Sequence, residues 1–160
     1  MITQIKRKLP QIKGKLFKKI QLNIGCGPKS EKDFIGIDVR DCGQEIIWDV
    51  RQGIPFPDNS VDMIYTSHFL EHLDNDEAEE FFRENYRVLK KGGKTAHVLP
   101  HATDPTAFYF DHKTFWNEER IDTLPGVPGL ENFKIIKNQS DEAKGIRRAM
   151  RELVFVLEKI

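Results

Sequence analysis

A short glycine-containing loop between two apolar runs constrains this chain more than any other feature. In the stretch LNIGCGPKSEKDFIGIDV, residues 22–39, an apolar run precedes Gly25 and Gly27, and a second apolar run ends at Asp38. Dinucleotide-binding loops carry three glycines and place the phosphates on the N-terminus of a following helix. Here the third glycine is absent, and residues 28–33 leave room for barely one helical turn. Such a loop would bind a phosphate poorly, whereas a nucleoside ligand without phosphate would not need the helix.

Length and composition indicate a single globular domain. The chain has 160 residues, enough for one buried core, and its 39% hydrophobic and 31% charged residues argue against extensive disorder. No apolar run approaches the roughly 20 residues of a membrane helix, and we expect no signal peptide. Cys26 and Cys42 are too few for a disulfide scaffold. We therefore expect a reduced, cytoplasmic setting.

The first 20 residues are strongly basic. They hold seven lysines and arginines and no acidic residue, so the charge of +7 there leaves −7 for the other 140 residues of a chain with net charge zero. Apolar residues recur at spacings of three or four, a helical stripe interrupted by Pro10 and Gly14. We expect residues 1–19 to form a helical flap on an acidic domain formed by residues 20–160. Peripheral membrane contact through the same segment is the alternative, and nucleic acid is not expected as a partner.

The rest of the chain alternates strand-like runs with helical or loop stretches. Asp74 to Asp76 can cap a helix that continues to about Leu89, and Gly92-Gly93 is predicted to end it. The predicted strands are residues 20–24, 34–38, 45–50, 61–67, 94–100, 132–139 and 151–160. This order predicts an α/β fold. We expect a doubly wound, mostly parallel sheet of seven strands, with a shortened first helix and the last two strands as an antiparallel edge hairpin.

The acidic residue at the end of the second strand strengthens the case for a nucleoside ligand. Glycines let the backbone approach a ligand closely, and a carboxylate at the next strand end can accept hydrogen bonds from both ribose hydroxyls. Asp38 is placed for that role. S-adenosylmethionine (SAM) fits the loop because it combines a nucleoside with an amino acid and carries no phosphate. The pattern by itself is weak evidence.

Four motifs in compact order add to this interpretation. They are LNIGCG, IGIDV, WDVRQGIPFPDNSVDMIYTSHFLEHL and YRVLKKGGKTAHVLP. Together they resemble the class I, Rossmann-like SAM-dependent methyltransferases, particularly small bacterial ones with an LNLGCG-like first motif. The resemblance covers about residues 20–117. It implies transfer of a methyl group from SAM to an unidentified oxygen, nitrogen or carbon acceptor, with a saccharide or a lipid-linked intermediate among the candidates.

Two other functions stay open beside methyl transfer. The first is a non-catalytic protein that binds SAM or S-adenosylhomocysteine and acts through its basic N-terminal arm. The second is an NAD-linked dehydrogenase, which the absent third glycine and the short first helix disfavour. The oligomeric state is not predicted from the sequence.

The resemblance also implies a set of cofactor-binding residues. Gly25 and Gly27 would pass beneath the methionine part of SAM, and Asp38 would hold the ribose. Asp49, in the turn after the third strand, would accept a hydrogen bond from the adenine amino group. The full implied set is Asn23, Gly25, Cys26, Gly27, Asp38, Val39, Asp49, Val50, Ser67 and His68.

The loop after the fifth strand is expected to face the acceptor. Methyl transfer from a sulfonium mainly requires positioning, and a base is needed only for a hydroxyl or a protonated amine. Histidine suits that role, so His112 is our first candidate base and His101 the second; the alternative is that both only bond the loop. The further residues expected on the substrate side are Glu71, Tyr109, Asp111 and Trp116. For Trp116 the alternative is a place in a small core under the loop.

The segment HFLEH, residues 68–72, also matches the H-x-x-E-H pattern of a zinc site. That site would need a helix through His68 and His72 and a third protein ligand. The predicted strand ends immediately before His68, and Asp74-Asn75 breaks the chain soon afterwards. We therefore predict no metal site from the sequence.

The short glycine loop leads to a first prediction. The basic flap is expected to act as the lid over SAM that a longer loop would otherwise supply. Deleting residues 1–19 should therefore raise the Kd for SAM measured by isothermal titration calorimetry. Unchanged affinity would show that the flap is not part of the cofactor site.

Overall fold

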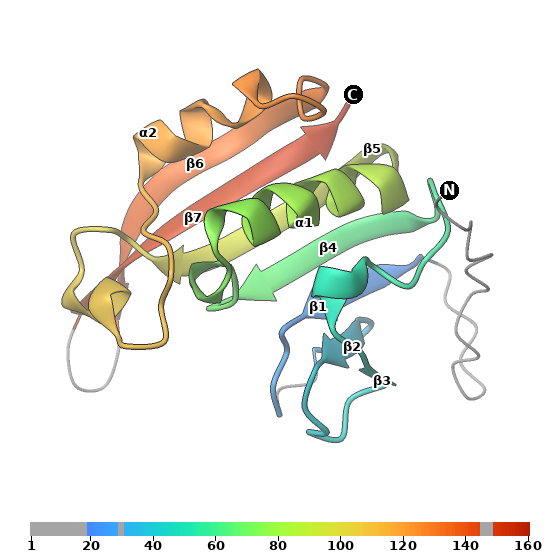
Figure 1. The fold of residues 1–160 in the computed structure, drawn as a ribbon, viewed down its shortest axis with the longest axis horizontal. Coiled ribbons are helices and arrows are strands. Elements are labelled where there is room, and N and C mark those ends of the chain that lie inside the picture. Colours follow the sequence, from blue (N-terminus) through green and yellow to red (C-terminus); the bar gives the residue numbers. More distant parts are fainter. Residues whose placement is uncertain (1–18, 29–30, 145–148) are drawn as a thin grey trace.

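A seven-stranded sheet organises the chain, as the computed structural model shows (Figure 1). The structure describes residues 19–28, 31–144 and 149–160, with side chains omitted for 142–144 and 149. The predicted flap over residues 1–19 lies, except for residue 19, outside the described residues. In the described part, no helix is long and apolar enough to cross a membrane.

The strand order is β3-β2-β1-β4-β5-β7-β6. The parallel strands are β1 (Gln21–Ile24), β2 (Ile35–Asp38), β3 (Ile46–Ile47), β4 (Val61–Ser67) and β5 (Leu89–Pro100), and the antiparallel ones are β6 (Phe133–Lys144) and β7 (Ala149–Lys159). From β1 the chain adds β2 and β3 on one side of the sheet, and β4 and β5 then follow on the other side of β1. This reversal creates a switch point at the carboxyl ends of the adjacent strands β1 and β4. The predicted α/β class, the mostly parallel sheet and the antiparallel edge hairpin are confirmed.

Helix α1 (Asn75–Val88) begins as the sequence predicts. Asp74 accepts a hydrogen bond from the backbone of Glu77 at 2.9 Å, and the Glu77 carboxylate accepts one from the backbone of Asp74 at 2.9 Å. This reciprocal cap satisfies two backbone donors that a helix start leaves unpaired. The apolar face of the helix then packs Phe81 and Phe82 onto the sheet.

The predicted end near Leu89 agrees with the structure, but the predicted role of the two glycines is wrong. The helix stops at Val88, and Gly92 and Gly93 lie inside β5 rather than beyond the helix. Leu89 follows the helix directly with extended backbone angles of φ −65° and ψ 138°, and its side chain is fully buried against the core. The two glycines instead occupy the irregular part of β5, where Gly92 has a positive φ of 78°.

The helices of the described part cover one face of the sheet. Phe82 of α1 contacts the ring of Phe155 on β7, and Asn138, which pairs with Phe155, donates to the Glu118 carbonyl in α2 (Glu118–Asp122). In the described residues, the β1–β2 and β2–β3 connections hold only turns and bends, so they supply no helix for the opposite face. Half-buried apolar side chains lie on that face: Met63, Tyr65, Val98, Val154 and Val156.

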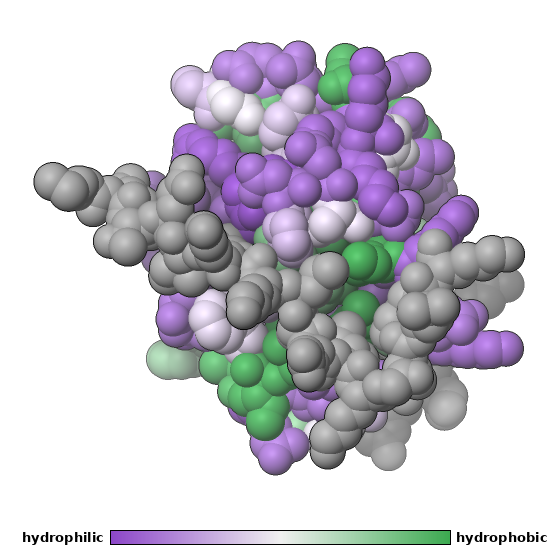
Figure 2. Space-filling view, turned by 90° about the vertical axis from the view of Figure 1, so that its right-hand side faces the viewer, coloured by the Kyte–Doolittle hydropathy of each residue, from purple (hydrophilic) through white to green (hydrophobic). Residues whose placement is uncertain are grey.

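The region of β1 to β3 also exposes apolar side chains. Val39, Ile47 and Trp48 are 58%, 56% and 37% exposed. Figure 2 views the molecule from the right-hand side of Figure 1, and hydrophobic side chains gather in its lower part, at the height of β1 to β3 in Figure 1. The short connections thus leave the sheet accessible close to the carboxyl ends of its strands.

One ionisable side chain lies in the middle of the core. The imidazole of His97 on β5 is fully buried, with its two nitrogens 2.7 Å from the hydroxyls of Thr66 and Thr95. The rings of Phe82 and Phe155 pack against it. Burial lowers the pKa of His97 from 6.5 to about 3, because the charged form cannot be solvated there.

This burial predicts an acid-sensitive fold. Below pH 6.5 the unfolded chain binds a proton at His97 that the folded chain does not take up until about pH 3, so stability is lost as the pH falls through this range. Between pH 7.5 and 5.5, this histidine should remove about 1.4 kcal/mol from the free energy of unfolding, measured with urea. In His97→Gln the loss over the same interval should be smaller by that amount. Equal losses in the two proteins would contradict the assignment.

Candidate functional site

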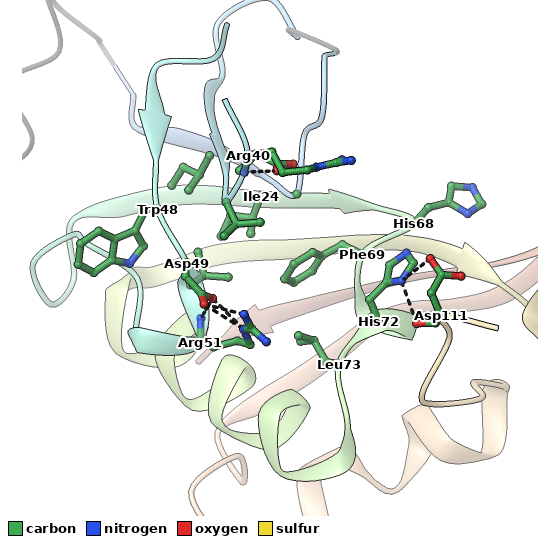
Figure 3. A pocket seen from close by; sticks show the side chains of 15 residues that line it. Ile24, Arg40, Trp48, Asp49, Arg51, His68, Phe69, His72, Leu73 and Asp111 are labelled. Carbon is green, nitrogen blue, oxygen red and sulfur yellow. Dashed lines mark hydrogen bonds and ion pairs between the residues drawn. The ribbon is translucent and has the colours of Figure 1, made fainter. Parts of the chain in front are cut away.

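A cavity of about 410 Å³ lies at the carboxyl ends of β1, β2 and β4 (Figure 3). Its lining comes from the ends of these strands, from the turn after β3, from the segment after β4, and from Asp111 in the loop after β5. Open α/β sheets bind their ligands at this switch point, and the volume is in the range of small-molecule sites.

The glycine loop forms one border of the cavity. Gly25 has a positive φ of 67°, and its N–H donates to the carbonyl of Ile37 on β2 at 2.8 Å. A Cβ atom at this position would lie 2.5 Å from Cδ2 of Phe69, closer than side chains can approach. Glycine is therefore required here both by the backbone angle and by the ring of Phe69.

Asp38 holds the same loop from β2. Its side chain is only 7% exposed, and its two oxygens accept hydrogen bonds from the backbone N–H groups of Gly27 and Arg40, each at 2.9 Å. Asp38 also lines the cavity beside Gly25. A carboxylate oxygen has more than one lone pair, so Asp38 can accept a ligand hydroxyl while it keeps these backbone bonds.

Asp49 lies across the cavity and caps a short helix, η1 (Val50–Gln52). Its carboxylate accepts from the Arg51 backbone at 3.0 Å and pairs with the Arg51 guanidinium, with Nη2 2.7 Å from Oδ2. Hydrogen bonding to Arg51 keeps the pKa of Asp49 below its usual value. Trp48 is fixed beside it, because its indole N–H donates to the carbonyl of Gly53 at 2.7 Å.

His68 takes an unusual backbone conformation directly after β4. Its φ is +53°, and its backbone N–H donates to the carbonyl of Val98 at 2.8 Å. The ring lies between two carboxylates, with Nδ1 3.4 Å from Glu71 Oε1 and Nε2 3.0 Å from Glu152 Oε1. Contact with Glu71, and then with Glu152, raises the pKa of His68.

The structure brings many of the predicted residues to the cavity and leaves others away from its lining. The predicted residues that line it are Gly25, Asp38, Val39, Asp49, Val50, His68 and Asp111. The predicted residues outside the lining are Asn23, Cys26, Gly27, Ser67, Glu71, Tyr109, Trp116, His101 and His112. Five of these last residues lie next to a lining residue in the sequence, whereas Gly27, Tyr109, Trp116 and His101 do not.

Trp116 and His101 both belong to the buried interior. Trp116 is 1% exposed and donates its indole N–H to the hydroxyl of Thr114, so it is a core residue. His101 is 4% exposed, with Nε2 2.8 Å from a Glu118 oxygen and Nδ1 2.8 Å from the Thr103 hydroxyl. Both ring nitrogens of His101 are engaged within the protein, so this geometry does not present it to an acceptor.

Several lining residues were missed by sequence reasoning. They are Ile24, Ile37, Arg40, Trp48, Arg51, Phe69, His72 and Leu73. Sequence proximity could have identified part of this set, since Trp48 and Arg51 flank Asp49, and His72 belongs to the HFLEH segment. The approach of Phe69 to Gly25 depends on the packing of two distant segments, and no sequence pattern indicates it.

The comparisons with solved structures define the fold. A SAM-dependent methyltransferase from Methanosarcina mazei aligns with a TM-score of 0.70 at 17% identity, covering 96% of this chain and 98% of that one. A SAM-dependent methyltransferase from Archaeoglobus fulgidus gives 0.65 at 18%, covering 94% and 89%. The N-methyltransferase NodS from Bradyrhizobium japonicum, in complex with S-adenosylhomocysteine, gives 0.62 at 15%, covering 88% and 78%. The fold is therefore that of the class I SAM-dependent methyltransferases.

The sequence comparison agrees with the fold. Residues 37–106 match a family model described as a methyltransferase domain, and this stretch runs from the end of β2 to the loop after β5. No curated protein matches the chain by sequence. The family match covers less than half of the chain, and the fold over nearly its whole length is that of the Rossmann-like methyltransferases, as the four motifs indicated.

The contact between Gly25 and Phe69 gives a testable prediction. In Gly25→Ala the new Cβ should displace the Phe69 ring toward the cavity and weaken SAM binding by about tenfold or more, by steric conflict at the ligand. Gly43→Ala is the matched control, because Gly43 has a similar φ of 85° with nothing within 4 Å of its added Cβ. Both variants should lose about 1–2 kcal/mol of stability to backbone strain. Calorimetry with SAM should find reduced affinity for Gly25→Ala alone.

Proposed function

We propose that this protein binds SAM in the cavity and transfers the methyl group to an oxygen, nitrogen or carbon atom of an acceptor. The observation that carries the proposal is the meeting of the Gly25 turn and the Asp38 carboxylate at the switch point of the sheet, with no helix following the turn in the described residues of the loop. A phosphate would lack a helix N-terminus there, whereas a ribose and an amino acid need only close backbone and a carboxylate.

Each part of SAM has a complementary partner in this cavity. We assign the ribose hydroxyls to Asp38 and the adenine amino group to Asp49, whose carboxylate would exchange part of its pairing with the half-exposed Arg51 side chain for the ligand. The apolar side chains of Val39 and Val50 and the indole of Trp48 would lie along the adenine. In these assignments the end of β2 contacts the ribose, and the turn after β3 contacts the adenine.

The methionine part of SAM would lie over the glycine turn, next to the ring of Phe69. An aromatic face attracts a cation, so Phe69 is suited to the positively charged sulfonium. The acceptor would enter from the side of His68, His72 and Asp111, which line the cavity beyond Phe69. In the reaction, the acceptor lone pair attacks the methyl carbon as the carbon–sulfur bond breaks, and its electron pair goes to sulfur. Positioning is the main contribution that this chemistry requires from the protein.

A base is needed when the acceptor is a hydroxyl or a protonated amine. His112 is the candidate that we keep, because its ring lies 4.8 Å from the ring of His72 at the cavity edge. We do not keep His101, because both of its nitrogens are engaged in the interior. The acceptor itself, with a saccharide or a lipid-linked intermediate as candidates, stays a proposal, and so does a cytoplasmic location.

Calorimetry with three ligands tests this function. SAM and S-adenosylhomocysteine should bind with one site each, and NAD should not bind. Asp38→Asn should weaken SAM binding by about tenfold or more, as expected for loss of charged hydrogen bonds to the ribose. Asp41→Asn is the matched control. Asp41 is an exposed carboxylate in the β2–β3 connection, three residues after Asp38, and it does not line the cavity. Equal effects of the two substitutions would contradict the proposed ribose contact.

Catalysis is tested separately by following S-adenosylhomocysteine release in the presence of hydroxyl, amine and carbon acceptors. Release that depends on one acceptor class would establish methyl transfer. Tight S-adenosylhomocysteine binding without product from any class would instead favour a protein that binds the cofactor without catalysis.

A further inference from the structure

Three potential metal ligands converge beside the cofactor cavity. Glu71 and His72 belong to the short helix η2 (Leu70–His72) after β4, and His112 lies in the loop after β5. One ligand atom from each of the three side chains lies within 4.8 Å of the other two. Two imidazoles and one carboxylate form a donor set that suits zinc and similar divalent transition metals.

Backbone hydrogen bonds hold the two segments together. The carbonyl of Glu71 accepts from the N–H groups of Lys113 and Thr114, at 2.7 and 3.2 Å. The Thr114 hydroxyl also donates to the carbonyl of Leu73 at 3.0 Å. His112 is thereby held opposite His72, with the two rings 4.8 Å apart and nearly perpendicular. The cluster thus arises from fixed backbone and not from flexible side chains alone.

Backbone carbonyls fix the tautomer of both histidines. Nδ1 of His72 lies 3.2 Å from the carbonyl oxygen of Asp111, and Nδ1 of His112 lies 3.2 Å from that of Ala107. A carbonyl oxygen can only accept, so each Nδ1 must carry the proton in these hydrogen bonds. In the neutral form, each Nε2 then keeps its lone pair. Metal-binding histidines commonly use this arrangement, in which a backbone carbonyl fixes the tautomer.

The carboxylate of Glu71 is an independent indication that a cation is bound. Glu71 is only 2% exposed, and in the described part of the chain neither carboxylate oxygen has a hydrogen-bond partner. Its nearest cationic group is Nδ1 of His68 at 3.4 Å, a distance at which the contact is an ion pair without hydrogen-bond geometry. Buried carboxylates are normally paired or bound to a metal, because an unsatisfied buried charge is costly.

We propose that Glu71, His72 and His112 bind one Zn²⁺ ion at the edge of the cavity. Three protein ligands leave one position of a tetrahedral zinc open, which is the arrangement of catalytic zinc sites. His72 and Asp111 both line the cavity, so an ion bound by His72 would lie on the side from which the acceptor would enter (Figure 3). The existence of this metal site does not depend on the proposed function. The role of the metal in methyl transfer does rest on the proposed function.

This site differs from the one that the H-x-x-E-H pattern suggested. His68 lies outside η2, and its ring faces Glu71 and Glu152. The third ligand comes instead from His112, 40 residues beyond His72 in the sequence. The expectation of no metal rested on the lack of a helix through His68 and His72, and a site completed by His112 from the loop after β5 does not need that helix.

The position of the ion selects an acceptor class. An acceptor hydroxyl bound at the open position would release its proton more readily, since a zinc-bound oxygen has a much lower pKa than a free one. With His112 bound to the ion, the zinc takes the place of a histidine base, and the proton passes to solvent. The oxygen lone pair then forms a bond to the methyl carbon. The carbon–sulfur bond breaks, and its electron pair remains on sulfur in S-adenosylhomocysteine. We therefore infer that the methylated atom is an oxygen.

Metal titration tests the site without any methyl acceptor. Protein freed of metal by chelator should bind one equivalent of ZnCl₂ in calorimetry, and CoCl₂ should give the visible absorption of a tetrahedral cobalt site. His72→Asn and His112→Asn should each weaken Zn²⁺ binding by about tenfold or more. Both histidines are partly exposed, so these variants should fold, and their thermal unfolding is recorded alongside.

The control is His101→Asn, which removes a histidine of the same loop that lies outside the cluster. It should bind Zn²⁺ as the unchanged protein does. Absence of stoichiometric binding, or equal weakening in all three variants, would overturn the proposal. SAM affinity is measured on the same samples, and His112→Asn should leave it unchanged. Zinc binding without SAM binding would refute only the proposed function, and SAM binding without zinc binding would refute only the metal site.

Discussion

The carboxylate of Asp38 is the interaction on which the cofactor site depends. It joins the glycine turn after β1 to the end of β2 by accepting from Gly27 and Arg40, and it does so while nearly buried. Hydrogen bonds to a charged group contribute about 1.5–3 kcal/mol each, which matters in a loop with no helix in its described residues. The same carboxylate also faces the cavity, so the group that shapes the turn is the group proposed to bind the ribose.

Short connections explain both the open sheet face and the composition of the site. The described residues between β1 and β3 contain no helix, so helical cover lies on the face that carries α1 and α2. On the other side of the switch point, the segment after β4 and the longer loop after β5 carry another group of ionisable side chains: His68, Glu71, His72, Asp111 and His112. The cofactor end of the cavity is thus built from strand ends, and the acceptor end from loops held together by backbone hydrogen bonds.

Prediction from sequence succeeded where the signal is local. The Asp74 cap and the hairpin at the end of the chain follow from patterns within a few residues, and the structure has both. The strand predicted over residues 45–50 is reduced to Ile46–Ile47, because η1 begins at Val50. The glycines at 92 and 93 do not stop the helix, since the buried Leu89 already begins β5. Trp116 could not be placed from sequence either, because the sequence pattern around an aromatic residue in a long loop is the same whether its ring faces a ligand or the core.

The sequence by itself determined the class of fold, the glycine turn and the carboxylate opposite it. The succession of strands along the chain and the lengths of the loops follow directly from neighbouring residues. Only the tertiary structure decided that Phe69 lies against Gly25 and that His101 is enclosed by the core. It alone also brought His112 beside Glu71 and His72. The physical reason is that the contact of Phe69 with Gly25, and that of His112 with Glu71 and His72, join residues 40 or more positions apart. Such contacts are set by the packing of the sheet and not by any local pattern.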